Sequence, residues 1–233
     1  MKKTFLAVFF SLFLLTSANA EIGVNVGVSA QIGSMETSGK EASSDGTSQT
    51  SDVEEALFGT AGFFIEKDLS FLPGPFGRIA IGFDNIAHDI DLGTQSNFRA
   101  ASLGAAGAAG AAVSAGNNSL TAEVTGFQTI YATVNITDWL YVKAGSVTVD
   151  VDTEYTQNGS KQSSYGNSHE LDGSVMGVGV SKSTDNGFFM RLEYNDYDID
   201  GKSVTSTKTD SKFTATLNDV SGTTGRLSIG KSF

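Results

Sequence analysis

Charges of both signs occur inside several segments that are otherwise built from apolar and small residues. These charged residues are Glu66, Arg78, Asp84, Glu123, Lys143, Arg191, Glu193 and Arg226. A charge that is removed from water must form an ion pair or hydrogen bonds with its neighbours or with trapped water. The sequence therefore predicts a buried network of ion pairs, for which the alternative reading is a gated path for ions.

Two pairs within this network are expected from the spacing of the residues. Arg191 and Glu193 are two residues apart, which places both side chains on one face of a strand. Glu66 and Arg78 flank one short connection, so they can face each other across two paired strands. We interpret the network as a polar core that fills and closes an interior.

Two acidic clusters offer the oxygen ligands that hard cations such as calcium and magnesium prefer. Their carboxylates belong to Asp150, Asp152, Glu154, Asp196, Asp198 and Asp200. A spacing of two places each set of three on one face of a strand, but no calcium-loop motif accompanies them. We therefore interpret them as solvated groups near the bases of loops, and we predict no metal site and no cofactor.

The two histidines, His88 and His169, are the side chains best suited to acid–base chemistry. A histidine together with a serine and an acid would support a hydrolase or an acyltransferase. Serine and aspartate are so frequent in the surrounding polar segments that their proximity carries little weight, and no catalytic motif is present. The sequence thus predicts no catalytic residue.

The segments that position these residues alternate between apolar and polar side chains. From Ile22 to Ile32 every second residue is apolar, and the residues between are Gly, Asn, Ser and Gln. This period of two predicts a strand with one apolar face. The pattern recurs in eight segments, at about residues 22–32, 55–67, 78–84, 120–136, 139–152, 170–181, 188–195 and 213–233.

Short and long polar connections separate these segments in turn. The long connections are expected at about residues 33–52, 91–119, 153–167 and 196–210, and the second contains the Ala/Gly-rich stretch 100–116. An even number of alternating segments with this order of connections predicts an all-β fold, an eight-stranded antiparallel up-and-down transmembrane β-barrel. The long connections are expected to face outside and the short turns to face the periplasm.

Two local features accompany the pattern. In the fifth segment Leu140 and Val142 start on one face, whereas Val147 and Val149 fall on the other, so we expect a bulge near Gly145. Aromatic residues gather at the turn ends of the segments and predict an interfacial girdle. These residues are Phe76, Trp139, Tyr141, Phe188 and Phe233.

Composition excludes several classes of protein. The formal net charge of −11 over 233 residues disfavours binding to nucleic acid and to bare anionic membrane. The sequence has no cysteine, which excludes a disulfide framework, a cysteine metal site and a lipid attached through cysteine. Beyond the first twenty residues no apolar window is long enough for a membrane helix, whereas a barrel needs an apolar residue only at every second position.

The two ends of the sequence carry recognisable signals. Residues 1–20 have a basic start, an apolar run and a small-x-small ending at Ala18 and Ala20, which predicts a cleaved signal peptide before a barrel domain at 21–233. The final segment alternates through Leu227 and Ile229 to Phe233. A last strand that ends in an aromatic residue resembles the C-terminal assembly signal of outer-membrane barrels.

The signal peptide, the eight amphipathic segments, the long loops and the terminal Phe233 together resemble the small bacterial outer-membrane barrels, namely the OmpA-type transmembrane domain, OmpX, OmpW and the opacity proteins. The resemblance implies a location in the outer membrane, in contact with membrane lipid and lipopolysaccharide. It also implies assembly by periplasmic chaperones and the barrel-assembly machinery. A monomer with a structural or surface-interaction role, in adhesion or envelope integrity through an extracellular ligand of its loops, is expected first. A narrow porin-like channel is the alternative, and a lipid-modifying enzyme comes third.

Overall fold

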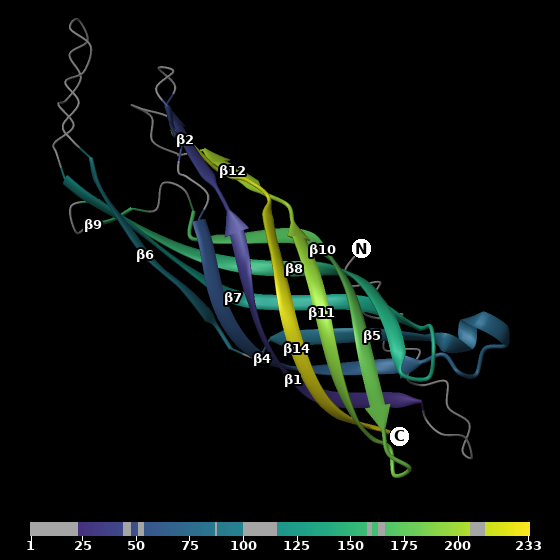
Figure 1. The fold of residues 1–233 in the computed structure, drawn as a ribbon. Coiled ribbons are helices and arrows are strands. Elements are labelled where there is room, and N and C mark those ends of the chain that lie inside the picture. Colours follow the sequence, from purple (N-terminus) through teal and green to yellow (C-terminus); the bar gives the residue numbers. More distant parts are fainter. Residues whose placement is uncertain are drawn as a thin grey trace, which may run out of the picture.

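The computed structural model describes residues 23–43, 48–50, 54–86, 88–99, 116–157, 160–162, 166–205 and 213–233, and it consists almost entirely of β-strands (Figure 1). The predicted signal peptide with Ala18 and Ala20 lies outside the described residues, as does most of the Ala/Gly-rich stretch. No helix among the described residues has the length and apolar character needed to cross a bilayer.

Eight long strands of the described chain form a closed ring. They are β1 (Val24–Thr37), β4 (Glu54–Asp68), β5 (Ile79–Ile86), β7 (Gly116–Asn135), β8 (Leu140–Gln157), β10 (Ser168–Ser183), β11 (Phe188–Ile199) and β14 (Val220–Ser232). Each strand pairs antiparallel with its neighbours in the order β7-β5-β4-β1-β14-β11-β10-β8, and β8 pairs back with β7. The predicted eight-stranded antiparallel up-and-down barrel is therefore confirmed.

Shorter strands extend the ring at the end that carries the long connections. There β6 (Ile90–Arg99) pairs with the part of β7 that lies beyond β5, and β9 (Ser160–Gln162) pairs with the end of β8. The strands β2 (Gly39–Ser43), β3 (Ser48–Thr50), β12 (Lys202–Thr205) and β13 (Phe213–Leu217) form a second sheet in the order β12-β13-β2-β3. The pairing of β2 with β13 joins the segment that follows β1 to the segment that precedes β14, and β13 lies within residues predicted as the start of the eighth ring strand.

Strands occupy part of each of the four segments predicted as long connections. Residues 91–99 and 116–119 of the second connection and parts of 33–52, 153–167 and 196–210 are strand. Period-two alternation arises where one face meets lipid or an apolar core. Most of these extensions are polar on both faces, so their sequence carries no such signal.

The opposite end of the barrel holds the short turns and both ends of the described chain. The backbone N–H of Gly23 donates to the carbonyl of Phe233 at 2.6 Å, and that of Phe233 donates to Val24 at 2.9 Å. A 3₁₀ helix, η1 (Gly74–Arg78), connects β4 to β5. Gly187 has φ +83° in the turn before β11, a left-handed conformation that favours glycine.

The backbone hydrogen-bond ladder of the barrel wall is interrupted between β4 and β6. Because β5 ends at Ile86, its ladder with β4 reaches no further than Gly62. Beyond that point the imidazole of His88 replaces the acceptor that a neighbouring strand would supply. The backbone N–H of Ala61 donates to its Nε2 at 3.1 Å. Nδ1 lies 3.1 Å from the carbonyl of Asp89, so the two bonds together require a neutral ring with its proton on Nδ1.

Replacing His88 by alanine should therefore speed hydrogen exchange at the amide of Ala61. Loss of a hydrogen bond worth about 1 kcal/mol corresponds to roughly a fivefold faster exchange. Residue-resolved exchange by NMR in detergent micelles measures this change. The variant His169→Ala is the control, and equal exchange at Ala61 in both variants would contradict the role assigned to His88.

Candidate functional site

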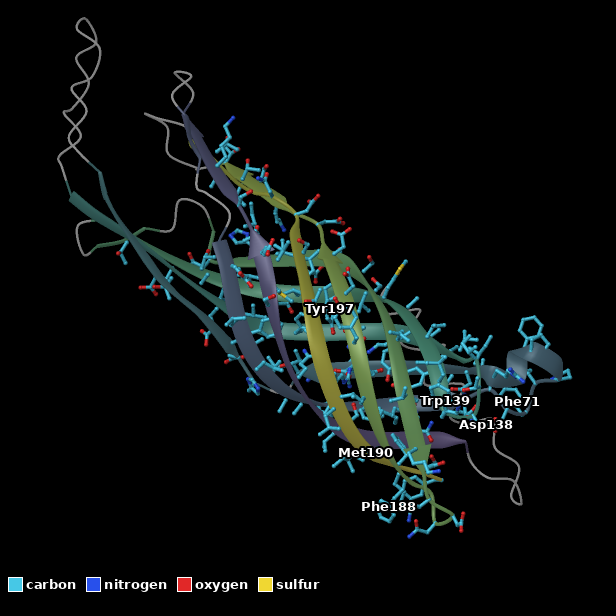
Figure 2. All side chains as sticks on the ribbon, viewed as in Figure 1. Phe71, Asp138, Trp139, Phe188, Met190 and Tyr197 are labelled. Carbon is cyan, nitrogen blue, oxygen red and sulfur yellow. The ribbon has the colours of Figure 1, made fainter. Side chains whose placement is uncertain are left out.

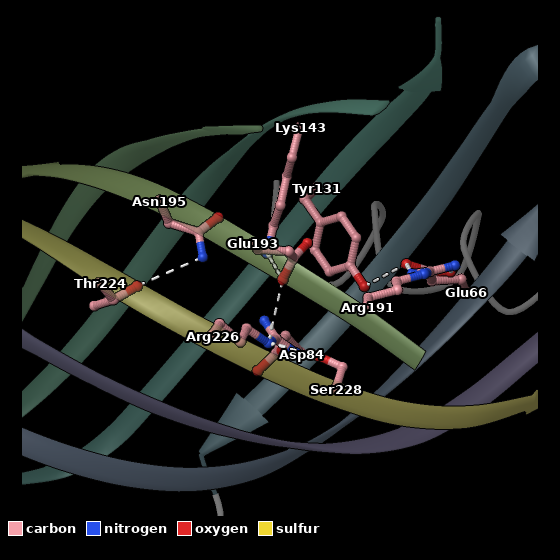
Figure 3. A network of polar contacts seen from close by, with 10 residues as sticks. All are labelled: Glu66, Asp84, Tyr131, Lys143, Arg191, Glu193, Asn195, Thr224, Arg226 and Ser228. Carbon is pink, nitrogen blue, oxygen red and sulfur yellow. Dashed lines mark hydrogen bonds and ion pairs between the residues drawn. The ribbon is translucent and has the colours of Figure 1, made fainter. Parts of the chain in front are cut away.

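The turn-side half of the barrel interior contains a polar network centred on Glu66, whose side chain is fully buried (Figure 3). Arg191 approaches it as a fork, with Nη1 2.5 Å from Oε1 and Nη2 2.8 Å from Oε2. The hydroxyl of Tyr131 donates to Oε1 at 2.8 Å, and the amide of Asn25 donates to Oε2 at 3.2 Å. Arg191 lies on β11 and Glu66 on β4, with β14 and β1 between them, so this pair spans the lumen.

A second centre in the same layer is the guanidinium of Arg226. It forms an ion pair with Asp84 on β5, again across two intervening strands. Its Nε lies 3.3 Å from Oε2 of Glu193 and donates to the hydroxyl of Ser228 at 3.2 Å. Nζ of Lys143 lies 3.9 Å from the same oxygen of Glu193. Six of the predicted residues thus come together as three acids and three bases, a set with no formal net charge.

Aromatic rings enclose the cations of this layer. The guanidinium of Arg191 lies 4.5 Å from the ring centroid of Phe189 and 5.7 Å from that of Phe64. Lys143 Nζ lies 4.3 Å from the ring centroid of Tyr131. Desolvated cation–π contacts contribute about 2 kcal/mol each. Sequence reasoning missed these rings because it followed charges only.

Glycine residues lie directly opposite several inward aromatic side chains. Four inward aromatic side chains each lie over a glycine directly opposite on the next strand, in the pairs Gly27–Phe64, Gly82–Tyr131, Gly179–Tyr141 and Gly230–Phe189. At Gly82, an added Cβ would lie 2.3 Å from the ring of Tyr131. Inward glycines opposite aromatic residues are a signal that the sequence does contain.

Two of the predicted network residues lie elsewhere. Arg78 is exposed at the end of η1 and donates from Nη1 to the carbonyl of Ile136 at 3.2 Å, because the strand alternation begins only at Ile79. Glu123 is exposed on the outer wall, since the register of β7 against β8 shifts between Val124 and Gly126 and reverses the phase.

The two predicted pairs within the network are also different in the structure. Glu66 pairs with Arg191 instead of Arg78. Glu193 pairs with Lys143 and Arg226, so Arg191 and Glu193 share a strand but have different ion-pair partners. Proximity along the chain and across one turn did not decide the partners, because long side chains reach across a narrow lumen.

The loop-side half of the interior is apolar. Its buried residues form one cluster consisting of Ile86, Val124, Phe127, Val147, Val149, Leu171, Val175, Tyr197 and Ile199. The rings of Phe127 and Tyr197 meet edge to face, with centroids 5.7 Å apart. This apolar layer lies beside the ion-pair layer, so the interior has a polar half and an apolar half.

The apolar layer explains why the expected bulge near Gly145 was wrong. β8 runs in continuous register with both neighbours through Gly145, and Val147 and Val149 simply point inward. The interior changes from polar to apolar along β8. Apolar side chains therefore appear on the inward face after Gly145, although the alternation of the backbone is unchanged.

The outer wall carries a belt of exposed apolar side chains (Figure 2). Its members on the strands are Val26, Val28, Ile32, Leu57, Phe63, Val134, Val142, Met176, Val178, Val180, Phe188, Met190, Leu192, Tyr194, Leu227 and Ile229. On β11 the outward positions run from Phe188 to Tyr194 and then change to Asp196 and Asp198. A water-facing surface rarely has such a continuous apolar band, whereas a lipid-facing wall requires one.

The turn-side rim of the belt is aromatic and basic. Trp139, Phe188 and Phe233 are about half exposed there, and Nζ of Lys231 lies 5.2 Å from both of the last two ring centroids. Tyr141 departs from the predicted girdle, since it points into the lumen and is 2% exposed. The segment predicted as an assembly signal presents Leu227 and Ile229 on the outer wall.

The acidic clusters lie beyond the loop-side rim and spread over several strands. Glu123 is opposite Asp152, and Asp150 is opposite Glu170. Within the described ranges no group of three or more acidic or histidine side chains has the geometry to hold a metal ion. The histidines contact different partners, and both ring nitrogens of His88 are engaged by backbone groups.

Comparison with known proteins yields structural neighbours only. No protein-family model and no characterised protein matches the sequence. Among solved structures, Neisserial surface protein A is 13% identical, with a TM-score of 0.40 and coverage of 91% of this chain and 97% of that one. The outer membrane protease OmpT from Escherichia coli is 9% identical, with a TM-score of 0.43 and coverage of 94% and 99%.

A third neighbour is Ail, the attachment invasion locus protein of Yersinia pestis, at 8% identity, a TM-score of 0.31 and coverage of 87% and 97%. Scores this low carry no information on activity or partners, and the fold rests on the strand pairing itself. By its closed antiparallel ring of eight strands and its apolar outer wall, the chain has the architecture of the small outer-membrane β-barrels.

Proposed function

We propose that the protein is a barrel of the bacterial outer membrane whose lumen is closed by its own side chains, and that it acts by presenting its loop-side end to partners, in adhesion or in support of the envelope. The observation that carries the proposal is the combination of a two-layered interior with an apolar outer wall. Membrane lipid and lipopolysaccharide are then its surroundings. Leu227, Ile229 and Phe233 would serve recognition by the assembly machinery, and the protein would act as a monomer.

The width of the barrel and the side chains in its interior support a closed lumen. An eight-stranded barrel has an interior just wide enough for side chains. An ion that crossed this interior would have to separate Arg191 from Glu66 or Arg226 from Asp84, and would then meet the apolar layer. Both steps cost free energy that a water-filled pore does not require.

Contacts between side chains at the loop-side end of the barrel support the interaction role. The hydroxyls of Ser203 and Thr216 are 2.9 Å apart, and the amide of Asn218 donates to the hydroxyl of Ser38 at 2.7 Å. The sheet of β12, β13, β2 and β3 is thus held together by contacts within the chain itself. A preformed surface loses little conformational entropy on binding, which favours recognition.

Planar-bilayer conductance of the refolded protein tests the closed lumen. Folding is first established by the shift in gel mobility between unheated and boiled samples. We expect no discrete conductance steps from folded protein. A reproducible open state across independent preparations would overturn the closed lumen and make the protein a narrow channel.

The channel is the second candidate function because, among the described residues, several buried polar atoms of the interior have no protein partner. They include Thr60 Oγ1, Arg191 Nε and Asn195 Oδ1. Buried polar groups of this kind usually bind internal water. Water in the polar layer would conduct only if the apolar layer also opened.

A loop replacement tests the interaction role. Exchanging residues 201–218 for a short Gly/Ser linker removes β12 and β13 while the ring strands remain. We expect the variant to assemble, with an unchanged gel shift, and to lose binding of whole cells to the surface or partner that the parent binds. Binding that is unaffected in the assembled variant would locate the contact elsewhere.

A further inference from the structure

One edge of the barrel wall has no neighbouring strand on the loop side. β4 keeps its pairing with β1 as far as Glu54, whereas its pairing with β5 ends at Gly62. Among the described strands β6 is the next neighbour, but it pairs with β7 and diverges from β4 toward the loop-side end (Figure 1). Residues 55–61 of β4, here called the β4 edge, therefore have one paired side and one open side.

One hydrogen bond identifies the backbone groups that face the open side. The N–H of Ala61 points to that side, because it donates to Nε2 of His88. Backbone groups alternate between the two sides of a strand, so the N–H and C=O groups of Gly59 and Leu57 point the same way. Within the described chain no strand pairs with the β4 edge on this side. The β4 edge thus offers a row of backbone donors and acceptors, and His88 occupies the end of the row nearest to β5.

The surroundings of this row place it outside the hydrocarbon of the membrane. His88 and Asp89 are both exposed beside Ala61. Unpaired backbone groups do not face hydrocarbon in membrane barrels, because they would lose their hydrogen bonds to water without replacement. The β4 edge therefore lies at the loop-side surface, where water or a partner can satisfy its backbone groups.

The outward side chains of the β4 edge determine which strand fits it. Leu57 is 82% exposed and offers an apolar contact. Gly59 leaves open space, since an added Cβ would meet only the carbonyl oxygen of Gln31, at 3.8 Å. An aromatic ring on an adjacent strand packs well over a glycine, as it does inside this barrel at Gly82 and Tyr131. An added strand should therefore carry an apolar residue opposite Leu57 and an aromatic residue opposite Gly59.

Charge determines the remaining position of the added strand. Glu55 and Glu36 lie directly opposite each other and are both exposed, and like charges in such a pair repel each other. Asp89 adds an exposed carboxylate at the other end of the β4 edge. A lysine or arginine opposite Glu55 offsets this repulsion, whereas an acidic strand adds to it. Charge complementarity therefore favours a basic partner.

We propose that the β4 edge accepts an extended, basic segment of a partner protein as an additional antiparallel strand. Read from its N-terminus, this segment carries at every second position an aromatic residue opposite Gly59, an apolar residue opposite Leu57 and a basic residue opposite Glu55. Main-chain hydrogen bonds supply the affinity of such an added strand, and its side chains supply the selectivity. The proposal rests on the interaction role proposed above and names the class of partner. It concerns a different strand from the replacement of 201–218, so either can fail alone.

Binding of a synthetic peptide to the whole protein in phosphatidylcholine nanodiscs tests the proposal. The peptide Thr-Tyr-Thr-Val-Thr-Lys-Thr carries the expected pattern, and the same peptide with Glu in place of Lys is its control. By fluorescence anisotropy we expect saturable binding of the lysine peptide and about fivefold weaker binding of the glutamate peptide. Bound lysine peptide should also slow hydrogen exchange at the amides of Leu57 and Gly59.

Variants of the β4 edge separate the backbone contribution from the charge. Gly59→Pro removes one N–H from the open side, where an edge strand tolerates proline, and should weaken binding of the lysine peptide at least fivefold. Gly59→Ala is the matched control, because it adds a Cβ and keeps the N–H. Glu55→Lys should reverse the preference between the two peptides, which tests the site even where Gly59→Pro does not fold.

Each contrary outcome has its own meaning. Equal binding by Gly59→Pro and Gly59→Ala, or no binding by the folded parent, would overturn the β4 edge as a site for an added strand. Equal binding of both peptides would overturn the basic partner, and equal binding to empty nanodiscs would show that lipid is the binding surface. Exchange at Leu57 and Gly59 that slows with protein concentration alone would assign the edge to a second copy. The gel shift on boiling reports folding, and failure of the parent to insert into nanodiscs would count against the proposed function instead.

Discussion

Glu66→Ala should lower the free energy of unfolding by about 3–5 kcal/mol, the cost of leaving one partner of a buried ion pair uncompensated. The variant leaves the buried guanidinium of Arg191 without its carboxylate partner. It also removes the oxygen atoms that accept hydrogen bonds from Tyr131 and Asn25. Urea unfolding in lipid vesicles, followed through the fluorescence of the single tryptophan, Trp139, measures the loss.

The control for this measurement is Glu123→Ala, because Glu123 is exposed on the outer wall. That change should stay within about 0.5 kcal/mol of the parent. The double variant Glu66→Leu, Arg191→Met removes both charges and should lose clearly less than Glu66→Ala. Equal stability of Glu66→Ala and Glu123→Ala would mean that Glu66 is solvated in the folded barrel.

Leu192→Arg should destabilise the barrel by about 2–4 kcal/mol when it is measured in a bilayer, since a cation on the lipid face near the midplane carries that cost. Leu192 lies in the middle of the apolar belt and is 59% exposed. Asp196→Arg, four residues along the same face of β11, lies beyond the rim and should change stability by less than about 1 kcal/mol. The same urea titration measures both, and the yield of heat-shifted barrel gives a second readout. Equal losses of stability in the two variants would contradict a loop-side edge of the apolar belt between Leu192 and Asp196.

The ring of strands was predictable because lipid imposes a period of two on one face of each strand. Val26, Val28 and Ile32 on β1 show this on the outside of the finished barrel. Where neither face met lipid, as in β2 and β12, the sequence carried no alternation and the strands went unrecognised. The prediction therefore succeeded within the belt and failed beyond it.

The membership of the ion-pair layer was largely predictable, whereas its pairing was not. Polar positions inside an alternating segment must face the lumen, which identified Glu66, Asp84 and Arg191. Their partners depend on which strands lie across the ring and on how far an arginine reaches, and neither quantity is local in sequence. Glu123 failed for a different reason, because a one-residue register shift is invisible in the pattern of residue types.

The junction of β1 with β14 is the one place in the ring where neighbouring strands are joined by no connection. Their ladder runs from Asn25 and Ser232 to Glu36 and Ser221, and the ladder of β2 with β13 continues it from Gly39 and Leu217 to Ser43 and Phe213. A closed ring can come apart most directly at such a junction, since no covalent link crosses it. The hydrogen bonds between β2 and β13 must break before this junction can open fully, so they raise the barrier to opening. The first and last connections thus slow the separation of the first ring strand from the last.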